Sequence, residues 1–221
     1  VRLPDVGQFL LNVSLMMLAA VALFGTLLSR AGGDLMRMLL TGIIFAVLFR
    51  AITGFLQRVI DPNEYAVVQV SSFARFARVE VGLLGISGGL TCLALIAAWQ
   101  MRHRLDVLAL GSETAINLGE DPRRGQFQSL LIIAVLVSVS TALVGPLAFL
   151  GLLVVSIARL ITPTSSHEIL LPSAALISAI TLVGGQLVLE RFLGLSTPLI
   201  VVVDVIGGVV FLMMLLQGRP R

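Results

Sequence analysis

Long apolar segments separated by short polar connections run through the whole chain. Six of these segments are long enough to cross a bilayer as helices, because about twenty residues span a hydrocarbon core of ~30 Å. The six segments cover residues 7–29, 35–59, 81–101, 127–144, 170–191 and 197–216. The pattern predicts an all-α, polytopic helical membrane protein whose residues 1–221 form a single transmembrane domain.

A seventh apolar segment, residues 146–161, is shorter than the others and follows a helix break. At this break Pro146 has no amide donor, and its ring clashes with the preceding helical turn. We therefore expect residues 146–161 to form a separate, abbreviated crossing.

The glycines of the apolar segments are expected to let helices approach closely, as small residues do in membranes. They are Gly82, Gly85, Gly88, Gly89, Gly151, Gly184, Gly185, Gly207 and Gly208.

The composition excludes an ordinary soluble protein. Apolar residues make up 57% of the chain and charged residues 12%, against about 45–50% and about 25% in soluble domains. The 15 basic residues are all arginine, and a net charge of +3 is too small for a nucleic-acid surface.

The single cysteine, Cys92, is expected to be a small buried side chain. We expect no metal site, because His103 and His167 lie far apart, and no catalytic site.

The distribution of arginine predicts the orientation in the membrane. The longest polar connection, residues 102–126, carries four arginines, and such connections stay in the cytoplasm. Alternation then places residues 30–34 and 217–221 inside and residues 61–80 outside. Six arginines lie outside or in the outer half of the membrane, and nine lie inside. The nine inner arginines are Arg30, Arg37, Arg102, Arg104, Arg123, Arg124, Arg159, Arg219 and Arg221. In the outer connection, residues 65–78 predict a short interfacial or re-entrant helix.

The inner loop, residues 105–121, contains two short helical stretches with glycines at which the chain can turn sharply. Ser112 is a candidate N-cap of the second stretch. The apolar residues Leu110, Ala115 and Leu118 are suited to insertion into a groove of another protein. The alternative is an ordinary linker on the membrane surface.

Several motifs in this chain resemble a known family. They are LDVLALGSETA at residues 105–115, LG at 118–119, ALVGPLAFLGL at 142–152, LTGI at 40–43 and LP at 171–172. Together they resemble the FecCD-type permeases of iron–siderophore, haem and vitamin B12 ABC importers. The resemblance implies the type II permease fold of these importers, with this chain corresponding to helices four to ten and the first three helices lacking. Because the chain starts at Val1 and not at methionine, we expect it to be part of a longer protein.

One departure from the family pattern narrows the expected substrate. Where most members carry Pro-His before Ile-Ala-Arg, this chain reads VVSIAR at residues 154–159. With DPNE at 61–64 and VGGQ at 183–186, it resembles the branch that handles catecholate-type ferric siderophores. This argues against vitamin B12 and haem as substrates.

The resemblance implies a transmembrane subunit of a bacterial ABC importer that moves a ferric siderophore across the inner membrane. The inner loop would then be the coupling element that sits on the ATP-hydrolysing subunits. The residues expected to couple to the ATPase are Leu110, Gly111, Glu113, Ala115, Leu118 and Gly119. The expected partners are a pair of ATP-binding subunits, a second permease, identical or paralogous, a periplasmic siderophore-binding protein and membrane lipid. We expect no cofactor on this chain, since ATP and Mg²⁺ would bind the partner ATPase.

Two charged residues lie inside apolar segments. A charge at depth costs at least ~2.5–3.5 kcal/mol, so Arg50 should face a partner or a wet cavity. Arg50, Thr53 and Gln57 share one helical face, and the family's equivalent helix lines the translocation path, where Arg50 would attract an anionic ferric chelate. The alternatives are an arginine held by backbone carbonyls or one that snorkels outward. Asp204 is expected to border the same path, where a pair with Arg50 would neutralise both charges. A proton-coupling carboxylate is the alternative.

Outer-face arginines are candidates for docking the binding protein, a mode that the family uses. Arg58, Arg75, Arg78 and Arg191 would meet acidic residues there, which mainly sets register and association rate. The alternative is interfacial anchoring.

Two other functions fit parts of the pattern. An ion-coupled secondary transporter would need acids or broken helices near the midplane, for which Asp204 and the break at Pro146 are the support. A non-transporting membrane scaffold would explain the helices and the inner loop without a path.

Overall fold

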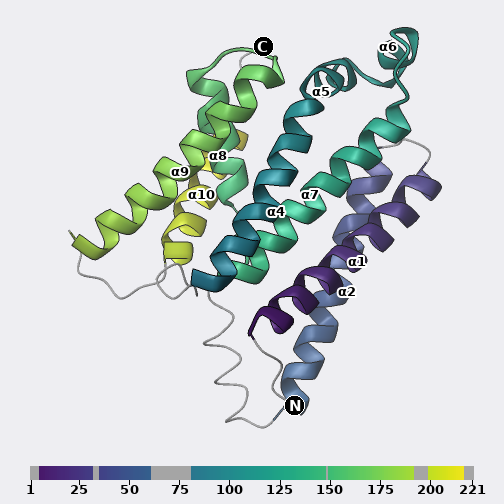
Figure 1. Ribbon diagram of the computed structural model, residues 1–221. Helices are drawn as coiled ribbons and strands as arrows, with labels where there is room; N and C mark the ends of the chain where they lie inside the picture. Colours follow the sequence, from purple (N-terminus) through teal and green to yellow (C-terminus); the bar gives the residue numbers. More distant parts are fainter. Residues whose placement is uncertain (1–4, 32–34, 61–80, 148, 192–198, 217–221) are drawn as a thin grey trace.

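The computed structural model describes residues 5–31, 35–60, 81–147, 149–191 and 199–216, and the regular secondary structure of this part of the chain is helical (Figure 1). The helices are α1 Asp5–Ala31, α2 Leu35–Val59, α4 Val81–Gln100, α5 Arg102–Ala109, α6 Ser112–Asn117, α7 Pro122–Val144, α8 Leu150–Ile161, α9 His167–Arg191 and α10 Leu199–Leu216. Within the described residues, five helices are long and apolar enough to cross a membrane. The all-α, polytopic fold expected from the sequence is confirmed. The helix proposed for residues 65–78 lies outside the described residues.

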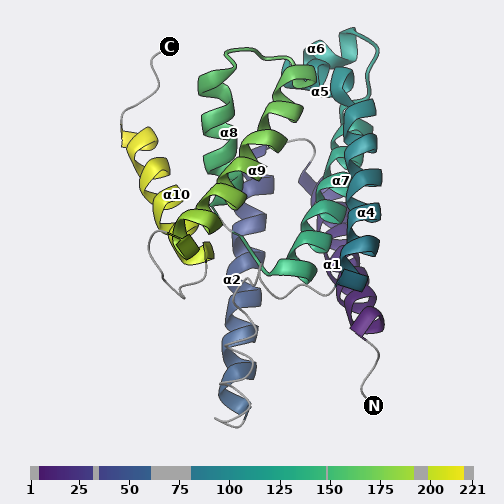
Figure 2. The same ribbon diagram turned by 60° about the vertical axis from the view of Figure 1, so that its left-hand side comes forward.

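The described helices form two groups that stand side by side (Figures 1 and 2). In the first group, α7 packs against α1 and α4, and α2 makes fewer contacts, with α1. Its core contains Phe9, Val13 and Val139. In the second group α8 packs against α9 and α10, around Leu150, Val154 and Val203. Each group thus has a hydrophobic cluster of its own.

The course of the helices brings the expected cytoplasmic connections to one end of the molecule. Figures 1 and 2 show α5 and α6 at the end where α1 and α8 finish and where α2 and α9 begin. The start of α4 and the ends of α2 and α9 lie at the opposite end. This arrangement is the one that the alternation of inside and outside connections requires.

The break at residues 145–146 separates α7 from α8. Asp121 caps the start of α7, where its Oδ1 accepts hydrogen bonds from the amides of Arg123 (3.0 Å) and Arg124 (3.4 Å). The helix ends at Val144, and Gly145 has φ +102°, a conformation that favours glycine. After the break, α8 has 12 residues, about 18 Å at ~1.5 Å per residue. It is therefore too short to cross the bilayer by itself.

Two side-chain expectations are corrected by the structure. Cys92 is exposed and not buried, because it lies on an apolar surface of α4 that also presents Leu93 and Ile96 outward. Most of the membrane glycines do not mark close approaches within the chain. A Cβ at Gly82, Gly85, Gly88, Gly89, Gly151, Gly184 or Gly208 would meet nothing within 4 Å.

Gly207 does mark a close approach between helices. A Cβ there would lie 2.8 Å from Cβ of Phe149 and 3.4 Å from its carbonyl oxygen, so Gly207→Ala must push α10 away from the start of α8. We expect a loss of about 1–3 kcal/mol of stability, measured as a lower thermal unfolding midpoint of the detergent-solubilised permease.

Gly125→Ala is the matched control for this prediction. A Cβ at Gly125 would approach Cδ1 of Leu108 at 2.7 Å, but this methyl group is the free end of a side chain and can rotate away. The thermal unfolding midpoint of the Gly125→Ala variant should therefore change much less than that of Gly207→Ala. Equal midpoints for the two variants would contradict the tight contact between α8 and α10.

Candidate functional site

The inner loop folds into two short helices, α5 and α6, joined at Gly111. This residue has φ +98° and ψ 159°, and Gly119 after α6 has φ +83°. Both conformations favour glycine strongly, because a Cβ would clash with the backbone. The prediction that the loop turns at its glycines is confirmed. Ser112 is the first residue of α6, and the N-cap is Gly111, which makes no side-chain hydrogen bond, so the proposed cap is wrong.

The loop is fixed on its inner side by packing and polar contacts to α7. Ala115 is fully buried, and Leu108 packs against Gly125. Arg104 pairs with Glu120 (Nε to Oε1, 3.4 Å) and donates from Nη1 to Oε1 of Gln128 (3.3 Å). The loop therefore presents a defined outer surface.

The outer surface of the loop carries three large apolar side chains. Leu110, Ile116 and Leu118 are 62%, 61% and 60% exposed, and Gly111, Glu113 and Gly119 are exposed beside them. Five of the six residues expected to couple to the ATPase are thus accessible. Ala115 is a correction: its side chain is 0% exposed, so no partner can touch it, and it packs the loop from inside.

Sequence reasoning missed Ile116, one of the three exposed large apolar residues of the loop. Ala115 and Ile116 are adjacent in a short helix and lie about 100° apart around its axis, so the sequence alone did not show which of the two would be buried. Burial of the smaller one turns the larger one outward.

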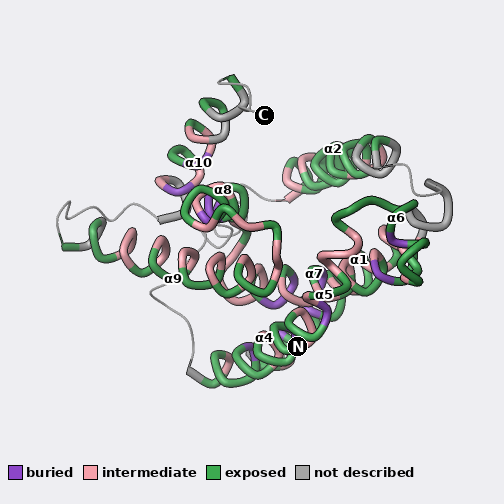
Figure 3. Tube along the Cα trace, turned by 90° about the horizontal axis from the view of Figure 1, so that it is seen from above, coloured by how far each residue is buried: buried purple, intermediate pink, exposed green. Residues whose placement is uncertain are grey.

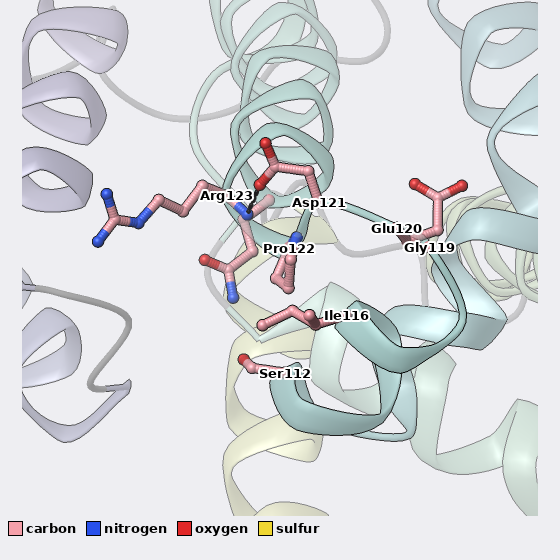
Figure 4. A pocket seen from close by; sticks show the side chains of 8 residues that line it. Ser112, Ile116, Gly119, Glu120, Asp121, Pro122 and Arg123 are labelled. Atoms are coloured by element: carbon pink, nitrogen blue, oxygen red, sulfur yellow. Dashed lines mark hydrogen bonds between the residues drawn. The ribbon is translucent and has the colours of Figure 1, made fainter.

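A cavity of about 540 Å³ opens between α6 and the start of α7 (Figure 4). Ile116 and Pro122 supply apolar walls, while Glu120, Asp121 and Arg123 place charges around them. An exposed apolar surface beside a polar-rimmed hollow is suited to receiving a side chain of another protein.

The other side of α5 is bound to the start of α9. Oδ1 of Asp106 accepts a hydrogen bond from the backbone amide of His167 (2.7 Å) and lies 2.6 Å from its ring Nδ1. The hydroxyl of Ser166 donates to Oδ2 at 3.5 Å. Partial burial by itself would raise the pKa of Asp106, but the hydrogen bonds and charge of His167 and the Ser166 hydroxyl hold that pKa below its ordinary value. Asp106 is therefore an ionised cap at neutral pH.

Arg102 adds further contacts at the same place. Its guanidinium lies over the ring of Trp99 at 4.9 Å and donates to the Trp99 carbonyl at 3.3 Å. Its Nε lies 3.7 Å from Oε1 of Glu168. These contacts between α5 and α9 were not predictable from the sequence, since residues 106 and 167 are far apart in the chain.

The two charges inside apolar segments are not paired with each other. Oδ1 of Asp204, which is half-buried, accepts a hydrogen bond from the amide of Phe149 (3.2 Å). Arg50 is exposed on α2, and the ion pairs between described residues do not include an Arg50–Asp204 pair. The expected pair is therefore absent, because Asp204 instead binds one of the amides that a helix start leaves without an internal partner. Of the other two expected path residues, Thr53 is exposed and Gln57 is partly buried.

The candidate docking arginines lie at the end of the molecule opposite α5 and α6. Arg58 is in the last turn of α2 and Arg191 is the last residue of α9, and both are exposed. Arg75 and Arg78 lie outside the described residues.

Known proteins with similar sequences are permeases of import systems. The petrobactin import system permease of Bacillus subtilis is 42% identical over 95% of this chain and 67% of its own length. A second petrobactin import permease, from Bacillus anthracis, is 27% identical over 99% of this chain and 62% of its own length. The hemin transport system permease of Yersinia pestis is 29% identical, over 88% and 58%. The chain thus spans about three fifths to two thirds of the length of these relatives.

The fold is also found in a solved structure, described as an inward-facing metal-chelate type ABC transporter. The match has a TM-score of 0.77 at 22% identity and covers 88% of this chain and 65% of the other. The model of the FecCD transport family matches residues 3–217. The chain therefore belongs to the FecCD transport family.

Proposed function

We propose that this chain is a transmembrane permease subunit of a bacterial ABC importer, located in the cytoplasmic (inner) membrane, that moves a ferric siderophore inward. The observation that carries the proposal is the set of exposed apolar side chains in and beside α6, Leu110, Ile116 and Leu118, at the end where the expected cytoplasmic connections gather. The 42% identity to a petrobactin import permease supports a siderophore as cargo.

ATP hydrolysis takes place on other subunits in this proposal. A pair of ATP-binding subunits, carrying ATP and Mg²⁺, seats on Leu110, Glu113, Ile116 and Leu118, and the cavity beside Ile116 receives a side chain from it. The permease performs no chemistry. It works with a second permease, identical or paralogous, and with a periplasmic siderophore-binding protein.

The path and the outer docking site are assigned by charge. Arg50, with Thr53 and Gln57 on the same face of α2, attracts an anionic ferric chelate, and Asp204 borders the path. At the outer end, Arg58 and Arg191, with Arg75 and Arg78, meet acidic residues of the binding protein. Rim charges of this kind mainly accelerate association.

The test is transport by the complete complex in proteoliposomes. The full reading frame containing this chain is reconstituted with its ATP-binding subunits and binding protein, and uptake of radioactive iron as the siderophore complex is measured. Loaded binding protein should stimulate ATP hydrolysis and iron should accumulate. Uptake that needs an ion gradient and does not depend on ATP would show a secondary transporter. Stimulation of ATP hydrolysis without iron uptake would fit a scaffold.

The same assay tests the path. Arg50→Gln should lower uptake roughly tenfold, because the charge that concentrates the anionic chelate is lost, whereas Arg50→Lys keeps the charge and should retain most of the uptake. Unchanged uptake by the glutamine variant, at equal amounts of assembled complex, would remove Arg50 from the path.

A further inference from the structure

The two helix groups meet mainly through α5. Among the described helices, the substantial packing between the groups is that of α5 against α9, while α5 also packs against α4 and α7. Seen from above, α5 lies beside α7, with the second group on its other side (Figure 3). The element that continues into the exposed α6 surface is therefore also the element that joins the groups.

A single carboxylate makes the strongest polar contact at this junction. Oδ1 of Asp106 binds both the amide and the ring nitrogen of His167, at 2.7 and 2.6 Å. The start of a helix offers unpaired amides and the positive end of the helix dipole, and both favour an anion. Hydrogen bonds to an ionised acceptor are also shorter and stronger than neutral ones.

The neighbouring ion pair contributes less to the junction. Arg102 and Glu168 are 3.7 Å apart, and the Glu168 side chain is 52% exposed. Exposed pairs of this kind are weak and are screened by salt. Asp106 is thus the residue on which the junction between α5 and α9 depends.

Movement of α9 is passed on to the whole second group. α9 packs along α8, and the start of α8 is held to α10 by the bond from the Phe149 amide to Asp204 and by the tight contact at Gly207. A displacement of α5 that reaches the start of α9 therefore reaches α8 and α10 as well.

We propose that Asp106 is a positioning residue for transport, which holds the ATPase-docking loop to α9 so that movement of the loop displaces the α8–α10 group. The inference rests on the proposed function. Without the Asp106 bonds, the loop still carries its docking surface and still packs against α7, but its movement reaches the first helix group alone.

The first experiment compares Asp106→Ala with Asp106→Asn in the reconstituted complex. The alanine variant should keep its ATP-binding subunits and still hydrolyse ATP, but transport about tenfold less substrate per ATP, since its hydrogen-bonded cap is lost. The asparagine variant retains an acceptor oxygen for His167 and should restore transport to within about threefold of the wild type.

Thr164→Ala is the matched control. The Thr164 hydroxyl accepts a hydrogen bond from the amide of Ser166 at 3.3 Å, which lies in the same connection but does not reach α5. Transport per ATP should be unchanged in this variant. If it falls as far as in Asp106→Ala, the effect reflects the order of the connection and not the bond between α5 and α9, and the proposal fails.

A cysteine pair keeps the proposal testable if the alanine variant does not assemble. With Cys92→Ser and any other cysteines removed, Asp106→Cys and His167→Cys place two thiols where the native side chains touch. Oxidation should restore transport per ATP and reduction should abolish it again in the same folded sample. Transport that is equal in both redox states overturns the proposal.

Failure of this inference is distinguishable from failure of the proposed function. If wild-type complex does not couple ATP hydrolysis to uptake, the proposed function is wrong. If wild-type complex does so and Asp106→Ala transports equally well per ATP, the function stands and the role of Asp106 is wrong.

Discussion

Ile116→Asp is expected to detach the ATP-binding subunits from the permease. Ile116 is 61% exposed and lines the cavity of about 540 Å³ beside α7. If a side chain of the ATPase fills this cavity, a carboxylate at its wall would lose its water, and the apolar contact of Ile116 would be lost as well. Apolar anchors at interface centres contribute about 2 kcal/mol or more, which corresponds to affinity roughly thirtyfold lower, measured by co-purification and by titration of the ATPase onto permease in nanodiscs.

Asn117→Asp supplies the control for added charge. Asn117 is the neighbouring exposed residue of α6, and this change introduces the same carboxylate without removing apolar area. Binding should stay close to that of the wild type. An equal loss of ATPase binding in both variants would mean that the added charge repels the partner. Unchanged binding of the Ile116→Asp variant would mean that the ATPase binds elsewhere on the permease.

The membrane helices were predictable because a bilayer imposes a simple rule. Each crossing must satisfy its own backbone and present apolar side chains, so hydropathy alone located α2 at 35–59, with the bounds that the structure has. The break before α8 was predictable for a similar reason, since Pro146 cannot continue a helix. These features depend on local sequence.

The arrangement of polar groups was not predictable, because it depends on contacts between distant segments. Asp106 and His167 are 61 residues apart, and Asp204 and Phe149 are 55 apart. Both aspartates looked like ordinary loop or membrane charges, yet each accepts a hydrogen bond at the start of another helix. Helix starts carry unpaired amides wherever they occur, but which carboxylate reaches them is decided by the fold.

In the inner loop, too, contacts with other segments decide what the sequence could not predict, here the burial of single residues. Its motif correctly indicated that Gly111 and Glu113 lie on an exposed turn, but it grouped Ala115 with them. In a helix of 6 residues, one side is covered by the rest of the protein, and only the packing of α6 decides that Ala115 takes that side and Ile116 faces outward.

The bond from Asp204 to Phe149 bears on the secondary-transporter alternative. A proton-coupling acid must exchange its proton with a path, whereas an acid that caps a helix start is needed for its acceptor oxygen. Asp204 lies one helical turn before Gly207, and both contact Phe149. This geometry favours a structural role.

Asp204→Ala and Asp204→Asn should therefore behave differently. The alanine variant leaves the Phe149 amide without an acceptor in an apolar setting, at a cost of about 1–3 kcal/mol, so both its thermal midpoint and its iron uptake should fall. The asparagine variant keeps an acceptor oxygen and should retain both. Uptake is compared at equal amounts of assembled complex in proteoliposomes, and the midpoint is measured on detergent-solubilised protein.

The asparagine variant decides between the two roles, because asparagine accepts a hydrogen bond but carries no titratable proton. Stable Asp204→Asn protein that transports normally leaves no proton for Asp204 to carry. Stable Asp204→Asn protein that fails to transport would contradict the capping role, since the cap is intact, and would show that the carboxylate itself takes part in moving the substrate.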